Sequence, residues 1–157
     1  MKNRNYWLML CNPDKWYGDK AIQNREVNNI LSHIKEYPWT IGKNTKSFKN
    51  IKVGDFGIIK VGNDNRSVEN RTLRNRVVDK LEPGIYAILE VVEKKGSVFY
   101  IDKNFNTRVN FKVVNNLFKN GKIIDKDKTK KLLENYFNSY SSCEITEEVY
   151  SKVLNEI

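Results

Sequence analysis

The chain has 157 residues, 39% of them hydrophobic and 11% aromatic, which is enough apolar material for one folded core and excludes a disordered chain. Lys and Arg number 28 against 19 Asp and Glu, so the net charge is +9. A charge of this size favours polyanionic partners, among which nucleic acid is the commonest. A basic protein that is merely soluble is the alternative.

The cysteines and the N-terminal residues bear on metal binding and localisation. Neither Cys11 nor Cys143 has a second Cys or a His at the spacing of zinc ligands, so we predict no metal site and two reduced thiols. The apolar run at 6–11 is too short for a signal sequence or a membrane span. These features predict a cytoplasmic protein that does not associate with membranes.

Short apolar runs bounded by turn residues predict buried strands. Such runs cover residues 6–11, 56–61 and 84–92. Residues 98–102 and 108–114 predict a hairpin, because Val109, Phe111 and Val113 alternate with polar residues.

Helical spacing of apolar residues predicts three helices. The first covers residues 25–37 and ends before Pro38, and the second covers 128–137. The third follows Thr146, a good N-cap residue. Between the second and third strands, residues 66–83 are rich in Arg and Asn, with spacing that permits one or two helical turns.

The predicted elements do not alternate regularly, which favours an α+β fold with a curved sheet or small barrel over a doubly wound sheet. The sequence contains no internal repeat and no linker rich in Gly, Ser or Pro. We therefore expect a single domain over residues 1–157.

Catalytic patterns are missing from the sequence. The one histidine, His33, falls on a polar helix face, so no Ser-His-acid triad can be assembled. No phosphate-cradling glycine loop occurs, and the acidic residues are mostly interleaved with lysines. Asp55 is interpreted as a turn residue and Glu90 as an edge charge. We therefore expect no enzyme and no cofactor.

The three tryptophans differ in their surroundings. Trp7 lies inside a predicted strand and is expected in the core, whereas Trp16 and Trp39 follow a strand and a helix in polar segments. An indole in such a place stacks well on a nucleobase, which contributes about 1–3 kcal/mol per base. The alternative is that both rings cap the ends of the core.

Several segments together resemble EVE domains. They are Tyr6 to Trp16, then Trp39 followed by Ile51 to Ile59, then Gly84 to Val91, and finally Ser142 to Tyr150. The resemblance implies a PUA-like fold, a curved open β-barrel of five or six strands with surrounding helices. It also implies a pocket of aromatic side chains that reads a modified nucleobase. EVE domains in bacteria occur alone or with McrBC-like restriction machinery.

The same resemblance suggests the site residues. Asn12 would present a polar group to the base and Trp39 would form a pocket wall, with Trp16 or Tyr86 as the second aromatic. The pocket rim would consist of Lys60, Val61, Gly62 and Asn63. The arginines of the 66–83 segment are suited to phosphate contacts. They are Arg66, Arg71, Arg74 and Arg76.

The sequence thus predicts a non-catalytic module that reads a modified base, flipped out of the stack, with a 5-methylcytosine-type mark in DNA as the expected target. Such a module serves modification-dependent restriction in the McrBC-associated type. Two alternatives stay open: a PUA-like module that reads a tRNA or rRNA modification, and a small hydrolase or nuclease without a recognisable motif.

Overall fold

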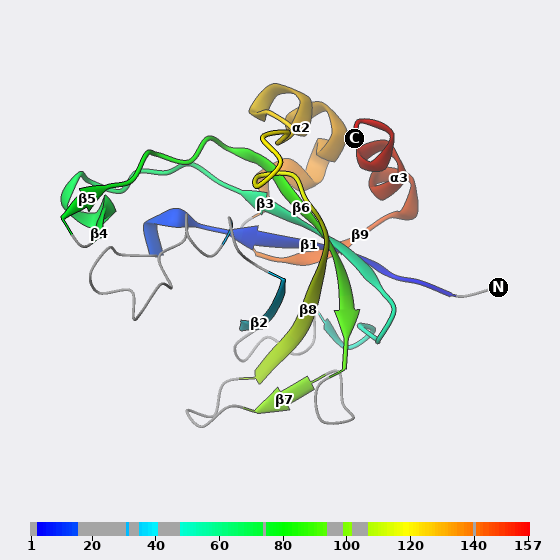
Figure 1. Cartoon of the computed structure of the whole chain (residues 1–157). Coiled ribbons are helices and arrows are strands. Elements are labelled where there is room, and N and C mark those ends of the chain that lie inside the picture. Colours follow the sequence, from blue (N-terminus) through cyan, green and yellow to red (C-terminus); the bar gives the residue numbers. More distant parts are fainter. Residues whose placement is uncertain are drawn as a thin grey trace.

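The computed structural model describes residues 3–15, 31, 35–40, 48–73, 75–93, 99–101, 107–139 and 141–157 (Figure 1). Seven strands form one mixed sheet in the order β2-β8-β6-β3-β1-β9, and β7 pairs with β8. The strands are β1 (Tyr6–Cys11), β2 (Glu36–Thr40), β3 (Phe56–Val61), β6 (Gly84–Val92), β7 (Phe99–Ile101), β8 (Thr107–Asn116) and β9 (Cys143–Ile145). The pair β1–β3 is parallel and the other described pairs of this sheet are antiparallel.

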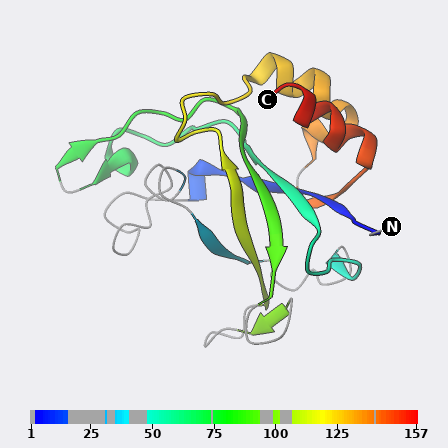
Figure 2. The same cartoon turned by 45° about the vertical axis from the view of Figure 1, so that its right-hand side comes forward.

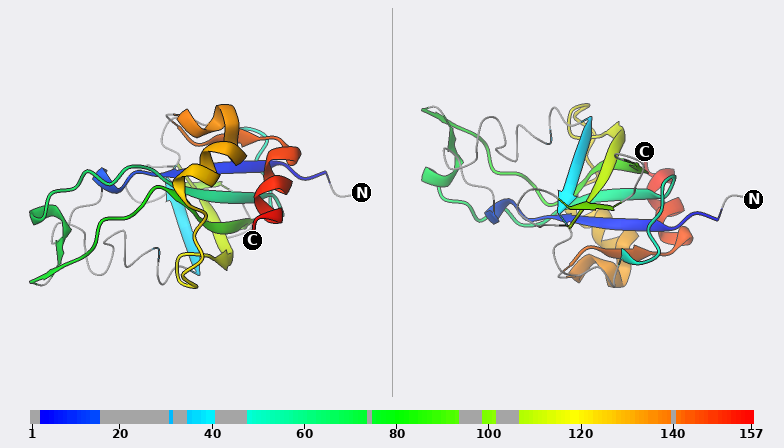
Figure 3. Two further views of the ribbon diagram at one scale, coloured as in Figure 1. Left: turned by 90° about the horizontal axis from the view of Figure 1, so that it is seen from above. Right: turned by 90° about the horizontal axis from the view of Figure 1, so that it is seen from below.

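The sheet is strongly curved. Its strand order is an open path among the described strands, so the sheet does not close into a ring. Figures 2 and 3 show it coiled, with the edge strand β2 passing beneath β1. The expected α+β class is confirmed, and the sheet is an open, curved one.

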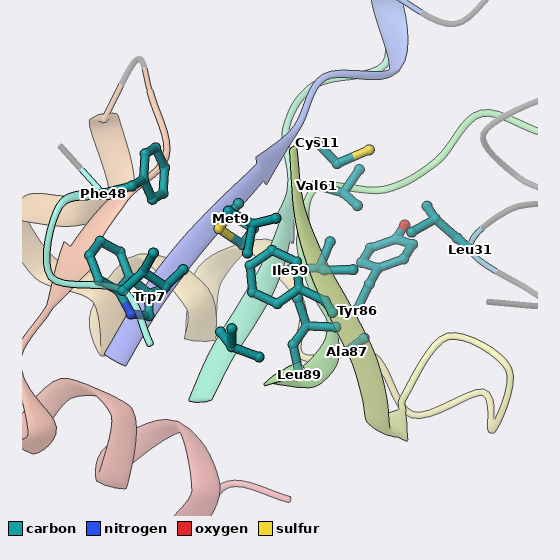
Figure 4. Close-up of a cluster of buried hydrophobic side chains, with 14 of the residues drawn as sticks. Trp7, Met9, Cys11, Leu31, Phe48, Ile59, Val61, Tyr86, Ala87 and Leu89 are labelled. Carbon is teal, nitrogen blue, oxygen red and sulfur yellow. The ribbon is translucent and has the colours of Figure 1, made fainter. Parts of the chain in front are cut away.

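Alternation along the strands gives the sheet two apolar faces, as the period of two requires. The inner face of the curve holds Trp7, Met9 and Cys11 from β1, with Ile59 and Val61 from β3 (Figure 4). The outer face holds a second cluster, which includes Leu8 and Ile58 together with residues of the C-terminal helices. Trp7 is fully buried, so its predicted place in the core is confirmed.

A bulge in β6 changes this alternation near one end of the sheet. Between Ile59 and Lys60 of β3 the register of β6 moves two residues, from Ala87 to Ile85. The extra residue is Tyr86, and both Tyr86 and Ala87 belong to the inner cluster. The bulge therefore turns a large aromatic side chain into the inner face.

Two helices and a 3-10 segment cover the outer face (Figure 1). They are α2 (Lys126–Leu133), η4 (Glu134–Asn138) and α3 (Glu147–Asn155). The side chain of Thr146 accepts a hydrogen bond from the Val149 N–H, as the sequence predicts, and Asp125 caps α2 in the same way through Lys128 N–H. None of the described helices combines the length and the apolar composition that a membrane span requires.

Two sequence interpretations need correction. Residues 36 and 37, expected at the end of a helix, begin strand β2, while residues 25–30 and 32–34 of that helix lie outside the described residues. The helical turns expected after residue 66 are instead a short 3-10 segment, η3 (Glu69–Arg71), and a ribbon of β4 (Thr72–Leu73) and β5 (Arg76–Val77). Asn75 has φ 63°, a left-handed conformation that asparagine tolerates in tight turns.

Candidate nucleic-acid interface

The parallel strands β1 and β3 end side by side, so the loops that follow them meet at one end of the sheet. We call this end the mouth. The Gly62 N–H donates to the Cys11 carbonyl at 3.0 Å. Asp14 joins the two loops, because its Oδ1 accepts from the Asn65 N–H at 2.7 Å. Asn12 holds Asp14 in turn, through a 3.0 Å bond from the Asp14 N–H to its side-chain oxygen.

Three predicted pocket residues therefore lie together at the mouth: Asn12, Gly62 and Asn63. Asn12 and Asn63 are exposed and Gly62 is half-buried. The side-chain oxygen of Asn12 already accepts the hydrogen bond from Asp14 in the turn. The NH₂ group of Asn12 is therefore the donor that this side chain can offer to a ligand. Polar groups at the ends of adjacent strands can approach a planar ligand at its edge.

A buried ion pair supports the mouth from inside. Both carboxylate oxygens of Asp64 bond the Arg66 guanidinium, at 2.8 Å from Nε and 2.7 Å from a terminal nitrogen. The Leu81 N–H donates to the same carboxylate at 2.8 Å. Burial alone would raise the pKa of Asp64, but the hydrogen bonds from Arg66 and Leu81 outweigh it and leave the pKa below its usual value.

This pairing changes the role expected for two arginines. Arg66 is only 3% exposed and its guanidinium is held by Asp64, so it does not lie where a phosphate would contact it. Arg71 is half-buried and donates to the Val78 carbonyl at 2.7 Å and to the Arg66 carbonyl at 3.4 Å. Both arginines stabilise the loop internally. Arg76 is exposed, and Arg74 lies outside the described residues.

A cleft of about 520 Å³ opens beside the mouth. Its walls come from the segment 76–82 and from the turn after β8, and Tyr86 and Phe118 contribute stacked rings whose centroids are 4.9 Å apart. Arg76 and Lys80 bring positive charge to the cleft, and Asp79 and Glu82 bring negative charge. The cleft thus offers aromatic and cationic groups together beside the mouth.

Tyr86, a predicted pocket residue, is thus a wall of this cleft, although its side chain is almost fully buried. Its hydroxyl donates to the Glu82 carbonyl at 2.6 Å. Burial, and next the Glu82 carboxylate, raise the pKa of Tyr86. The hydroxyl therefore stays protonated and acts as a hydrogen-bond donor. Its partner Phe118 was not predicted, because no periodicity marks a residue in the turn after a strand.

Cys11 and Tyr86 lie near each other at the mouth end of the inner cluster, as Figure 4 shows. Burial raises the pKa of the Cys11 thiol to about 12. A neutral, buried thiol is neither a nucleophile nor a metal ligand at neutral pH. Both cysteines are free in the structure. Within the described residues, no group of three or more potential ligands could hold a metal ion.

Lys60 and Val61 do not share a face of the sheet, so they cannot both form the rim as expected. The Lys60 ammonium lies on the side of the sheet that the helices cover. It is 2.6 Å from the Phe137 carbonyl oxygen and 4.4 Å from the centroid of the Phe137 ring. Burial lowers the pKa of Lys60. Val61 faces inward and is fully buried. Neither side chain reaches the exposed part of the mouth.

Trp39 lies in strand β2 rather than in a polar loop. Trp39 lies opposite Val109 of β8 in the strand register, and its half-buried side chain packs against the inner cluster. The same ring can therefore support the core with one part and present another part to a ligand. Trp16, the other predicted stacking residue, lies outside the described residues.

The opposite end of the sheet is organised around a second buried carboxylate. Asp55, expected as a simple turn residue, is fully buried. Its oxygens accept hydrogen bonds from the Trp7 indole and from the N–H groups of Asn5 and Lys52, each at 3.0 Å. Phe48 stacks on Trp7 at 5.3 Å. This end is tied together by core residues and backbone.

Comparison with solved structures identifies the fold. Human THYN1, whose crystal structure was determined in complex with DNA containing 5-methylcytosine, matches with a TM-score of 0.59 and 14% identity, covering 96% of each chain. Rpa0253 from Rhodopseudomonas palustris, an NMR structure, matches with a TM-score of 0.55 and 16% identity, covering 97% of this chain and 92% of that one. No protein-family model and no curated protein matches the sequence. The chain therefore shares its fold with these two proteins over nearly its whole length.

Proposed function

We propose that this protein binds nucleic acid and reads a modified base, with 5-methylcytosine in DNA as the mark, and that it catalyses no reaction. The observation that carries the proposal is the match over nearly the whole of both chains to human THYN1, whose structure was determined with DNA containing that base. The net charge of +9 supports a polyanionic partner.

The arrangement at the mouth suits a base that has left the helix stack. Flipping a base out of the duplex costs a few kcal/mol, which stacking on an aromatic ring and hydrogen bonds to the edge of the base must offset. Trp39 supplies an indole on the inner face, and Asn12, Gly62 and Asn63 supply polar groups at the ends of the strands. Arg76 and Lys80, both exposed beside the cleft, supply cations for the backbone. We assign the edge contacts of the base to the polar groups of the mouth, and its stacking to the inner face of the sheet, against which Trp39 packs.

The direct test is equilibrium binding of the whole chain to matched oligonucleotides. Single-stranded and duplex DNA carrying one 5-methylcytosine, the same strands with cytosine, and the corresponding RNA are compared by fluorescence anisotropy at low and moderate salt. We expect tighter binding to the methylated DNA, and an affinity that falls as salt rises because Lys and Arg displace counterions from phosphates. A preference for modified RNA over modified DNA assigns the protein to RNA instead. Equal affinity for methylated and plain strands of both kinds contradicts the proposal.

A further inference from the structure

Residues 62–83, which we call the arm, leave the sheet after β3 and return to it at β6. At the far end of the arm, β4 and β5 form a separate two-stranded sheet in which Thr72 pairs with Val77 and Leu73 with Arg76. Figures 1 and 2 show this ribbon projecting well away from the main sheet, on the side of the mouth. The described side chains of this ribbon, Thr72, Arg76 and Val77, belong to neither buried cluster.

The arm is nevertheless held in shape by its own polar groups. At its base, the Asp64 carboxylate bonds the Leu81 N–H on the returning segment. Further out, the Arg71 guanidinium donates to the Val78 carbonyl, and the Val78 N–H donates to the Arg71 carbonyl at 2.9 Å. These cross-connections link the outgoing and returning segments at two levels. An element that is braced in this way is presented in one conformation, which lowers the entropy lost on binding.

The tip exposes apolar side chains beside a cation. Val68 is 59% exposed and Val77 is 54% exposed, and Arg76 next to Val77 is exposed as well. Exposed valines on a protruding arm are not stabilised by water. Contact with DNA would bury these valines against base edges and bring the arginine to a phosphate or a guanine.

We propose that the tip of the arm enters the major groove of duplex DNA next to the modified base. The major groove, about 12 Å wide, admits a two-stranded ribbon without distortion, whereas the minor groove, about 6 Å wide, admits one only when the duplex is bent. Val77 then contacts base edges such as a thymine methyl group, and Arg76 contacts a guanine edge or a phosphate. The proposal rests on the proposed function, because it places the arm relative to a base held at the mouth.

The first test separates duplex from single-stranded DNA, since a single strand has no groove. Val77→Asp is compared with Val53→Asp, which introduces the same charge at a valine that is 51% exposed in the turn before β3, at the other end of the sheet. Both variants are checked for an unchanged melting temperature. We expect Val77→Asp to weaken binding to methylated duplex roughly tenfold or more, and binding to the methylated single strand by a clearly smaller factor, since Val77 also lines the cleft. Val53→Asp is expected to leave both affinities unchanged.

The second test locates the groove. Dimethyl sulfate methylates guanine N7 in the major groove and adenine N3 in the minor groove. We expect wild-type protein to protect guanine N7 beside the methylated site, and Val77→Asp to lose that protection. Protection of adenine N3 alone, or equal weakening of duplex and single-strand binding by Val77→Asp, would overturn the proposal. The proposed function is judged separately, by whether the wild type prefers the methylated single strand.

Discussion

The two ends of strand β3 use the same device for different purposes. Before the strand, buried Asp55 accepts hydrogen bonds from Trp7 and two backbone N–H groups. After the strand, buried Asp64 accepts them from Arg66 and the Leu81 N–H. The first carboxylate fastens core residues to one another, whereas the second organises a loop and the arm. Both ends are therefore fixed by a buried acid, and at the mouth this acid also holds the base of the arm, which carries exposed cationic groups.

The largest expected effect is on stability at the Asp55 end. Asp55→Ala leaves the buried Trp7 indole and two partly buried backbone N–H groups without their acceptor, so we expect a loss of about 3–5 kcal/mol in the free energy of unfolding. Urea unfolding measures this. The folded fraction should bind nucleic acid like wild type. A binding defect in folded Asp55→Ala would break the distinction between the two ends.

At the Asp64 end we expect a smaller loss of stability together with a loss of binding. Asp64→Asn keeps the shape but removes the charge that faces buried Arg66, which should lower the free energy of unfolding by about 2–3 kcal/mol. Because the Leu81 N–H and Arg66 are held less firmly, the arm becomes less ordered and duplex DNA binds more weakly. Thermal unfolding and anisotropy check the two effects. Undiminished duplex binding would contradict the supporting role of Asp64.

The pH dependence of stability sharpens the assignment of Asp64. Its pKa is lower in the folded protein than its ordinary value of 3.8. A carboxyl whose pKa falls on folding stabilises the protein fully above its unfolded pKa, and this stabilisation is lost as the pH falls through the folded pKa. The difference in melting temperature between wild type and Asp64→Asn should therefore shrink on acidification below about pH 4. A constant difference in that range would show that the charge of Asp64 is not what matters.

The smallest expected effect concerns cysteine reactivity. Cys11 is buried at the mouth with a pKa raised to about 12, whereas Cys143 is only half-buried. Iodoacetamide at neutral pH should therefore modify Cys143 first, and Cys11 only when the protein unfolds. Mass spectrometry of partly labelled protein distinguishes the two sites. Rapid labelling of Cys11 in the native state would mean that the mouth opens easily.

Local patterns in the sequence predicted much of the fold but less of the site. The strands at 6–11, 56–61 and 84–92 and the cap at Thr146 follow from periodicity and capping, which act within a few residues. Trp39 was placed in a loop because Pro38 was taken as a helix stop. Proline is tolerated in edge strands, and β2 lies at the end of the strand order.

The remaining differences arise from pairings that sequence distance hides. Four clustered arginines suggested phosphate contacts, but Arg66 folds back onto Asp64 two residues earlier, and Arg71 reaches the carbonyl of Val78. Lys60 and Val61 are neighbours in a strand, so their side chains point to opposite faces of the sheet, and this could have been predicted from the sequence. The role of Asp55 gave no such signal, because it depends on long-range contacts with Asn5 and Trp7.

The central claim is that the protein reads a modified base with the mouth and the inner face of the sheet, and Trp39, which packs against the inner cluster, tests it most directly. Trp39→Leu keeps an apolar side chain against the inner cluster but removes the planar ring. The measurement is the ratio of affinities for methylated and plain single-stranded DNA, with the melting temperature recorded beside it. Losing one stacking face costs about 1–3 kcal/mol, so we expect this ratio to fall towards unity while the protein stays folded. An undiminished preference for the methylated strand in folded Trp39→Leu would contradict the account.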